Sequence, residues 1–201
     1  MPPRATVLPM NVALQRLWTA EQFLSWAGTQ EGRFEFDGIG PVAMTGGNAR
    51  HSAITTNIHV ALRPRLRGTS CSHFGPDLAV RTEGEKVRSP DALITCTKFP
   101  GTDLVAPDPV VIFEVLSPTS GRTDRIEKVR EYALVPSIRR YIIVETKFAG
   151  VMVLHRKNEG DEWLAATLTG DDVLDIPEVG ITLPVAEFYE NVDFNEETAD
   201  E

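Results

Sequence analysis

The stretch Pro109-Val-Val-Ile-Phe-Glu-Val-Leu-Ser-Pro-Thr119 decides the fold of this 201-residue chain. Residues 109–116 are almost all apolar and partly β-branched, which predicts a strand that is buried on both faces. Glu114 is the exception, because it places an ionisable group inside the most apolar segment of the sequence. A buried carboxylate is unfavourable unless a cation or a proton neutralises it. Glu114 therefore either lies at a strand end, pairs with an arginine such as Arg125, or belongs to a functional site.

The segments around this strand predict a mixed sheet flanked by helices, in an α/β or α+β domain. Thr19 and Gln22 form a capping-box pattern that begins a short helix over 19–28. A hairpin is expected over 33–44, a second helix over 48–67 that Pro64 ends or kinks, and a third over 123–134. In the third, we expect Ile126, Val129 and Ala133 to form the apolar stripe. Further strands are expected at 69–74, 78–82, 91–95, 139–145, 151–155 and 163–168, and a closing helix at 184–189.

Composition and charge narrow the class of protein. The sequence is 42% hydrophobic and 24% charged, which excludes wholesale disorder, and no apolar run approaches the length of a membrane span. Its two cysteines, Cys71 and Cys96, cannot form a disulfide framework, so we expect small buried apolar residues and a reducing cytoplasm. We divide the chain into a lead-in (1–16), one domain (17–190) and an acidic tail (191–201).

The net charge of −9 is unevenly distributed along the chain. The segment 158–201 holds 14 of the 29 acidic residues and none of the 20 basic ones, which leaves residues 1–157 with a net charge of +5. An acidic end of this kind is either a solvated, solubilising face or a segment that competes with a polyanion for the basic body.

Two acidic residues and a lysine form the candidate chemical centre. Asp91, after Pro90, opens a predicted strand; if this strand lies beside 109–116, Asp91 and Glu114 point into one cleft and suit a hard cation such as Mg²⁺. Asp91 could equally be a turn former. Lys128 follows on the helix, on the same side as Asp124 and Tyr132. It is either half of an exposed ion pair with Asp124 or a cation beside a scissile phosphate.

The string Pro90-Asp91…Glu114-Val-Leu-Ser-Pro-Thr119…Asp124-Arg…Lys128…Tyr132 resembles the Uma-two family of restriction-endonuclease-like proteins, within the PD-(D/E)XK nuclease superfamily. The resemblance extends over about residues 17–190. It implies a restriction-endonuclease-like mixed β-sheet flanked by helices, with Mg²⁺ (or Mn²⁺) held by Asp91 and Glu114. The superfamily's usual lysine position is Leu116 here, and Lys128 matches a lysine displaced onto the following helix. Glu35 matches an acid that completes the metal shell, while Ser89 replaces an aromatic residue.

Several other residues are weaker candidates for the site. Asp77 precedes a strand and His51 begins a helix, so either could stand near the cleft, and Tyr132 belongs to the matching string. Cys71 and His73 share a strand face, but two ligands do not make a zinc site. Gly46-Gly47 is not followed by the Gly-Lys-Ser/Thr pattern of a phosphate-binding loop.

These observations predict a Mg²⁺-dependent endonuclease that hydrolyses phosphodiester bonds in DNA, with catalytic residues Asp91, Glu114, Lys128 and Glu35. The alternative is a catalytically inactive nuclease fold that binds nucleic acid or protein. A homodimer is expected by analogy, because cutting two strands favours two sites. Contacts to DNA phosphates would come from arginines of the basic body. They are Arg50, Arg63, Arg65, Arg67, Arg122, Arg125, Arg130, Arg139 and Arg140.

Overall fold

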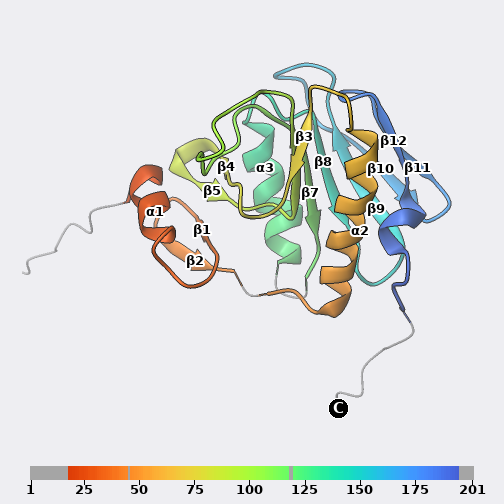
Figure 1. Cartoon of the computed structure of the whole chain (residues 1–201), viewed down its shortest axis with the longest axis horizontal. Coiled ribbons are helices and arrows are strands. Elements are labelled where there is room, and N and C mark those ends of the chain that lie inside the picture. Colours follow the sequence, from red (N-terminus) through yellow and green to blue (C-terminus); the bar gives the residue numbers. More distant parts are fainter. Residues whose placement is uncertain (1–17, 45, 118–119, 195–201) are drawn as a thin grey trace, which may run out of the picture.

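The centre of the molecule is a six-stranded mixed sheet with the order β10-β9-β8-β7-β6-β3 (Figure 1). The computed structural model describes residues 18–44, 46–117 and 120–194. Within the sheet β7 and β8 are parallel, whereas all the other neighbours are antiparallel. The strands are β3 (Ser72–Phe74), β6 (Ala92–Thr95), β7 (Pro109–Val115), β8 (Arg140–Val144), β9 (Gly150–His155) and β10 (Leu164–Thr169).

Strand β7 is buried on both faces, as its apolar run predicts. Successive side chains of a strand point to opposite faces. Val111, Phe113 and Val115 therefore pack into one core cluster, while Ile112 packs into another on the opposite face. Glu114 falls in the alternation on the same side as Ile112, which is the side that the third helix covers.

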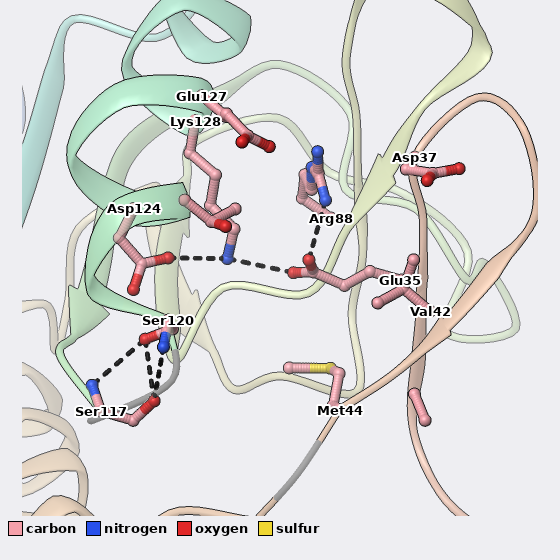
Figure 2. A pocket seen from close by; sticks show the side chains of 12 residues that line it. Glu35, Asp37, Val42, Met44, Arg88, Ser117, Ser120, Asp124, Glu127 and Lys128 are labelled. Atoms are coloured by element: carbon pink, nitrogen blue, oxygen red, sulfur yellow. Dashed lines mark hydrogen bonds and ion pairs between the residues drawn. The ribbon is translucent and has the colours of Figure 1, made fainter.

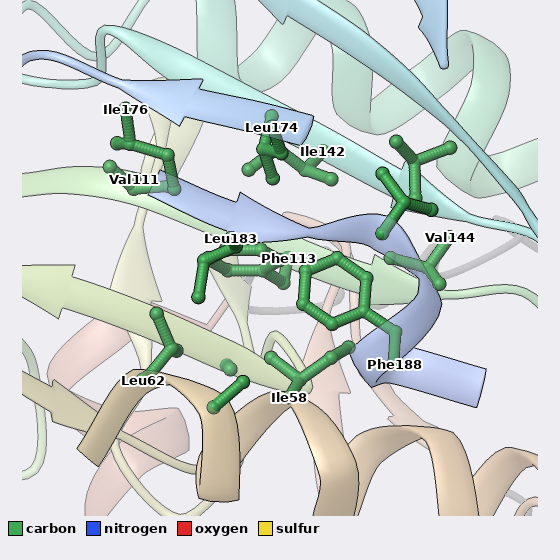
Figure 3. Packing of buried hydrophobic residues seen from close by; sticks show 14 of the residues in the cluster. Ile58, Leu62, Val111, Phe113, Ile142, Val144, Leu174, Ile176, Leu183 and Phe188 are labelled. Atoms are coloured by element: carbon green, nitrogen blue, oxygen red, sulfur yellow. The ribbon is translucent and has the colours of Figure 1, made fainter. Parts of the chain in front are cut away.

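Helix α2 (Ala49–Arg65) covers one face of the sheet, together with η3 (Val185–Tyr189) and the hairpin β11 (Val173–Ile176)–β12 (Ile181–Pro184). The helical spacing seen in the sequence is confirmed, because Ile58 and Leu62 are buried against Phe113 and Phe188 (Figure 3). The side chain of Asn48 caps the helix by accepting a hydrogen bond from the His51 N–H. Pro64 lies in the last turn, and the helix ends one residue later.

A second, smaller sheet with the order β2-β1-β5-β4 lies beside the third helix. It contains β1 (Phe34–Phe36), β2 (Pro41–Ala43), β4 (Val80–Arg81) and β5 (Val87–Arg88), and the 3₁₀ turn η1 (Glu83–Glu85) joins the last two. The predicted hairpin is confirmed, with Gly38 at φ 90° in the turn. Helix α1 (Ala20–Ala27) begins with the predicted capping box, and its Phe23 ring stacks on Phe36.

The expected third helix differs from the structure in two respects. It is divided into a π-helical turn, η2 (Thr123–Glu127), and α3 (Lys128–Ala133). The predicted apolar stripe is wrong at Ile126, which is 46% exposed, whereas Val129 packs partly buried against the core. The buried side is polar instead, and it holds Asp124, Lys128, Glu131 and Tyr132. Apolar spacing did not identify the buried side of this helix, because that side packs on charged partners.

The expectation that the two cysteines are small buried apolar residues is also wrong. Cys71 and Cys96 are partly exposed and form a disulfide. The antiparallel register pairs Ser72 with Thr95, so the next two residues outward, Cys71 and Cys96, lie opposite each other across β3 and β6. The bond closes a loop whose ends are 25 residues apart and fixes the short edge strand β3 to the sheet.

Removal of this disulfide should destabilise the protein. We expect a double substitution, Cys71→Ala with Cys96→Ala, to lower the free energy of unfolding by about 3 kcal/mol, since a loop of this size restricts the unfolded chain to that extent. Urea unfolding with and without reductant measures it. Reductant should weaken the wild type and leave the double variant unchanged; equal stability of the oxidised wild type and the variant would contradict the prediction.

Across the described part of the chain, none of the helices is both long and apolar enough to cross a bilayer. The lead-in (1–16) and residues 195–201 of the predicted acidic tail lie outside the described residues. Within the described start of the tail, Val192 and Phe194 pack partly buried against the main core.

Candidate active site

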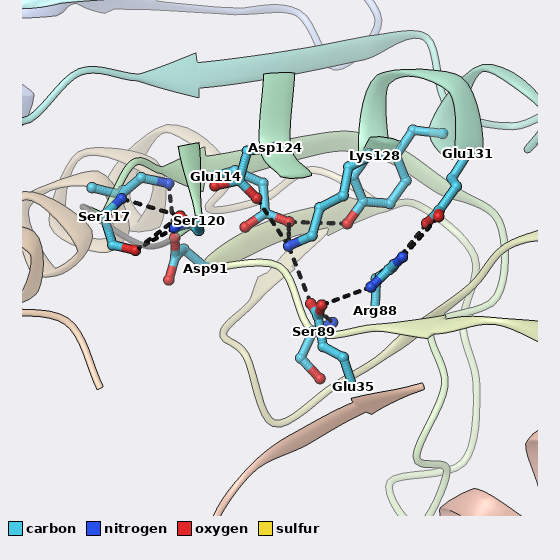
Figure 4. Close-up of polar contacts among 12 residues, drawn as sticks. Glu35, Arg88, Ser89, Asp91, Glu114, Ser117, Ser120, Asp124, Lys128 and Glu131 are labelled. Carbon is cyan, nitrogen blue, oxygen red and sulfur yellow. Dashed lines mark hydrogen bonds and ion pairs between the residues drawn. The ribbon is translucent and has the colours of Figure 1, made fainter. Parts of the chain in front are cut away.

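Asp91 and Glu114 meet at one end of the central sheet. The register pairs Ala92 of β6 with Phe113 of β7, so the preceding residue Asp91 lies opposite Glu114. The Asp91 Oδ2 atom accepts a hydrogen bond from the Val115 N–H at 2.7 Å, which holds this carboxylate against β7. Both acids line one small cavity of about 80 Å³. Figure 4 shows their side chains from close by. The sequence-based expectation that they share a cleft therefore agrees with their placement.

Lys128 reaches into the same site from α3. Its Nζ lies 2.9 Å from Glu114 Oε1, 3.1 Å from Glu35 Oε1 and 3.2 Å from Asp124 Oδ1. Figure 4 shows the ammonium among these carboxylates, which come from β7, β1 and the π-helical turn, and Figure 2 shows it between Asp124 and Glu35. The alternative of an exposed Asp124–Lys128 pair is excluded, because Lys128 is 4% and Asp124 1% exposed.

The π-helical turn explains how the chain delivers these groups. Its wider i to i+5 hydrogen bond runs from the Lys128 N–H to the Thr123 carbonyl, and such turns often occur at functional sites. The backbone carbonyl of Ser120 accepts a hydrogen bond from the Asp124 N–H at the start of the turn. The Ser117 hydroxyl donates to the Ser120 hydroxyl at 2.9 Å. The loop after β7 thereby leads directly into the turn that carries Asp124 and Lys128 on one side.

Glu35 is tied to the third helix through Arg88. The Arg88 guanidinium donates to Glu35 at 3.0 Å and, through two of its nitrogens, to Glu131 at 2.6 and 2.7 Å. Lys86 also donates to Glu131 at 2.8 Å. Burial disfavours the charged form of Glu131, but the hydrogen bonds from Arg88 and Lys86 outweigh this and lower the pKa of Glu131. Glu131 and Glu35 in turn raise the pKa of Arg88, although burial disfavours its charge.

The Ser89 N–H donates to the second oxygen of Glu35 at 3.1 Å. Ser89 thus uses its backbone in the site, at the position where the resemblance led us to look for an aromatic ring. The early hairpin is consequently connected to the site by a buried network rather than by an apolar contact.

Carboxyl groups outnumber the lysines and arginines of the site. Five carboxyl groups (Glu35, Asp91, Glu114, Asp124 and Glu131) lie around Lys86, Arg88 and Lys128, and His51 is 3.3 Å from Asp91. Burial first, and then the charges of Asp124, Asp91 and Glu35, raise the pKa of Glu114, while Lys128 opposes this rise. Burial disfavours the Lys128 ammonium, but Glu114, Glu35 and Asp124 raise its pKa, so it stays charged.

Tyr132 holds Glu114 from a second direction. Its hydroxyl donates to Glu114 Oε1 at 3.0 Å, and burial followed by the charge of Glu114 raises its pKa, so the phenol keeps its proton. The ring packs edge to face on Tyr141, whose hydroxyl donates to the backbone carbonyl of Asp124 at 2.9 Å. Tyr132 thereby holds the Glu114 side chain, and Tyr141 holds the backbone at Asp124.

His51 lies at the site and Asp77 does not. His51 Nε2 is 3.3 Å from Asp91 Oδ2; burial lowers the pKa of His51, but the hydrogen bond and charge of Asp91 outweigh it and raise the pKa. Asp77 is exposed and lines a separate cavity between α1 and β1. Leu116, at the usual lysine position of the superfamily, is buried in the core.

Asp124 is the residue that sequence reasoning missed as a member of the site. Its Oδ1 lies near Lys128 Nζ but in a direction unsuitable for a hydrogen bond, so this buried oxygen has no hydrogen-bond partner. In the sequence, Asp124 precedes Lys128 by four residues, a spacing that is equally typical of an exposed ion pair on a helix. A buried carboxylate oxygen without a donor is available to a cation.

A wider hollow of about 390 Å³ opens beside this centre, between the β1–β2 hairpin and the third helix (Figure 2). Glu35, Arg88, Asp124 and Lys128 form its floor, and Val42 and Met44 belong to its wall. The hollow gives a polar ligand access to Lys128. Among the described residues, no three His, Cys, Asp or Glu side chains converge as a preformed metal cage.

Comparison with known proteins gives the family of this chain. The model of the Uma2 family, described as "Putative restriction endonuclease", matches residues 20–186. The chain therefore belongs to the Uma2 family, which is the family that the sequence resemblance named.

Two relatives and one solved structure are similar to this chain. An uncharacterized protein of Synechocystis sp. is 27% identical over 177 residues, covering 87% of this chain and 92% of its own length. A second one from the same organism is 26% identical over 170 residues, covering 81% and 94%. A crystal structure described as a putative nuclease belonging to DUF820, from Anabaena variabilis, covers 86% of this chain and 98% of its own, at a TM-score of 0.64 and 15% identity. This likeness confirms the restriction-endonuclease-like mixed fold.

Proposed function

We propose that this protein is an endonuclease that hydrolyses phosphodiester bonds in DNA with Mg²⁺, or Mn²⁺, held by Asp91 and Glu114. The observation that carries the proposal is the pair of facing carboxylates with a buried ammonium beside them. Membership of a family described as restriction endonucleases supports nucleic acid as the substrate class. The proposal goes beyond the family description in naming DNA as the substrate and Mg²⁺ or Mn²⁺ as the metal.

The residues present fit a divalent cation. Mg²⁺ is typically bound by one or two carboxylates together with waters, rather than by an all-protein cage. Asp91 and Glu114 supply that number of carboxylates, and Asp124 Oδ1, which makes no hydrogen bond but lies 3.2 Å from the Lys128 ammonium, is a further oxygen nearby.

Each side chain has a distinct role in this proposal. A bound Mg²⁺ would polarise a phosphoryl oxygen and lower the pKa of a bound water. Lys128 stays protonated among its carboxylates, so it acts as a positive charge for a phosphate oxygen and not as a base. Glu35 holds the ammonium from the hairpin side, and Tyr132 donates to Glu114 and orients it. His51 orients Asp91.

The contending function is an inactive nuclease fold that binds nucleic acid or protein. The observation that favours it is that protein carboxylates already surround Lys128, which a phosphate would have to approach. Calorimetric titration with Mg²⁺ separates the two functions, since an active site should bind the ion and the Asp91→Asn variant should not.

The cleavage test uses supercoiled, linear, single-stranded and branched DNA and matching RNA, each with Mg²⁺ or Mn²⁺. We expect wild-type cleavage of at least one DNA substrate, and a loss of about 1000-fold in Asp91→Asn, because Asp91 is half of the proposed metal site. Asp171→Asn is the matched control, since Asp171 is exposed on the β10–β11 turn. Absence of wild-type cleavage on the whole panel would refute the endonuclease proposal. Cytoplasmic location and a homodimer stay predictions.

A further inference from the structure

A second polar cavity lies far from the carboxylates, where the end of α2 meets the edge strand β3. It has a volume of about 370 Å³, and no acidic residue lines it. Arg63 of α2 and Arg67, two residues beyond the end of α2, line it together with His73 of β3 and the loop between them. In Figure 1 the end of α2 and β3 lie together at one end of the molecule, away from the start of α2 that reaches the site.

Three of the nine arginines that the sequence offered for DNA binding are paired with described carboxylates, and six, including Arg63 and Arg67, are not. Within the described ranges, Arg65 pairs with Glu187, Arg125 with Glu145 and Arg140 with Glu178. Arg63 and Arg67 form no ion pair with any described carboxylate and are exposed. Their charges are therefore available to an external anion.

The loop between these elements is held in a fixed shape. Gly68 has φ 82°, a conformation that side chains rarely adopt. The Thr69 hydroxyl donates to the Leu66 carbonyl and accepts from the Cys71 N–H. The disulfide then joins Cys71, itself part of the cavity wall, to β6. The two guanidinium groups thus flank a preformed polar hollow.

One face of α2 connects this cavity to the proposed active site. His51 contacts the Asp91 carboxylate, and His59, two turns further on, donates from Nε2 to the Asp91 backbone carbonyl at 3.1 Å. The His59 ring lies 5.3 Å from that of His73, which lines the cavity. His51, His59 and Arg63 follow one another on α2 at multiples of four residues, and Arg67 lies two residues beyond the end of the helix. This spacing places Arg63 about 18 Å along the helix from His51.

We infer that Arg63 and Arg67, with the polar hollow between α2 and β3, form an anchoring site for backbone phosphates of duplex DNA, remote from the bond that is cut. The inference rests on the proposed function and adds the surface along which the substrate lies. A separation of about 18 Å corresponds to about five base-pair steps of 3.4 Å. Phosphate contacts of this kind position a duplex without reading its sequence. A short substrate at the active site cannot reach the anchor.

The test is DNA binding in EDTA, where cleavage plays no part. The double variant Arg63→Gln with Arg67→Gln should bind a 20-base-pair duplex roughly 10-fold more weakly at about 0.1 M salt, and the slope of log affinity against log salt should fall by about 1.8, for two lost phosphate contacts. Its affinity for a three-base-pair hairpin should equal that of the wild type. The matched control, Lys147→Gln with Lys157→Gln, removes two exposed charges, one before β9 and one after it, and should bind the duplex as the wild type does.

Other outcomes would overturn the inference. Unchanged duplex affinity in the Arg63/Arg67 variant, an equal loss in the control variant, or no wild-type binding to the duplex would each do so. A polyglutamate 20-mer that binds as tightly as the duplex would overturn the assignment to phosphates. Failure of wild-type cleavage alone refutes only the endonuclease proposal, because the binding measurement does not depend on it.

Discussion

Replacement of Lys128 with methionine should lower the free energy of unfolding by about 3 to 5 kcal/mol at pH 7.5, which is the usual cost of leaving a buried charge without its partner. Methionine keeps most of the volume and removes the ammonium that three carboxylates contact within 3.2 Å. Urea unfolding of both proteins measures the difference. Lys147→Met is the matched control, because Lys147 is exposed and its replacement should change the stability by less than about 0.5 kcal/mol.

The loss should depend on pH in a defined direction. The folded-state pKa of Glu114 is already raised above its ordinary value, so its contribution to stability is present at low pH and is lost as pH rises through the folded pKa. Lys128 opposes that rise, and its removal raises the pKa of Glu114 further. The stability difference between wild type and Lys128→Met should therefore shrink as the pH falls from 7.5 toward 5. An equal difference at both ends of this range would contradict the charge argument.

A double variant separates charge from packing. Addition of Glu114→Gln to Lys128→Met removes one of the carboxylates that lost its partner, so part of the lost stability should return. Residues in contact typically couple by about 0.5 to 3 kcal/mol. If the two substitutions simply add, the ammonium does not stabilise Glu114, and the loss in the single variant is one of packing.

The central part of this site was predictable from sequence because it depends on local pattern. The apolar run around Glu114 identifies a buried strand, and an acid inside such a run signals a neutralising partner whatever the rest of the fold. β6 and β7 are consecutive along the chain, which favours their pairing in the sheet. These features need no knowledge of distant contacts, and the structure places Asp91 and Glu114 together at the same sheet end.

The environment of Lys128 was less accessible, for a physical reason. Apolar periodicity locates the buried side of a helix only when the partner surface is apolar. Here the partners are Glu35 from the distant hairpin, Glu114 and Arg88, so the polar side of 123–134 is the buried one. The π-helical turn at Thr123–Glu127 also shifts the helical phase. The disulfide was missed because spacing along the chain does not reveal that Cys71 and Cys96 face each other across two strands.

Substitution of Glu114 with glutamine should have opposite effects on activity and on stability. Glutamine keeps the shape and an oxygen that can accept from the Tyr132 hydroxyl, while it removes a carboxylate whose charge burial disfavours. Lys128 retains Glu35 and Asp124 as partners. We therefore expect the metal-free variant to be at least as stable as the wild type, by up to about 1 kcal/mol, as is common when a functional site is relieved of unfavourable charge.

The same variant should lose the response to the metal and about 1000-fold or more of any Mg²⁺-dependent cleavage. For the wild type, Mg²⁺ at 100 times its dissociation constant should add about 2.7 kcal/mol to the free energy of unfolding, since the ion binds only the folded state. Glu114→Gln should show little of this gain, whereas Asp171→Asn should show all of it. Unfolding curves with and without Mg²⁺, together with cleavage rates, measure both effects on the same samples. A Glu114→Gln protein that is less stable without metal, yet still gains stability from Mg²⁺, would place the ion elsewhere and leave Glu114 as a structural partner of Lys128.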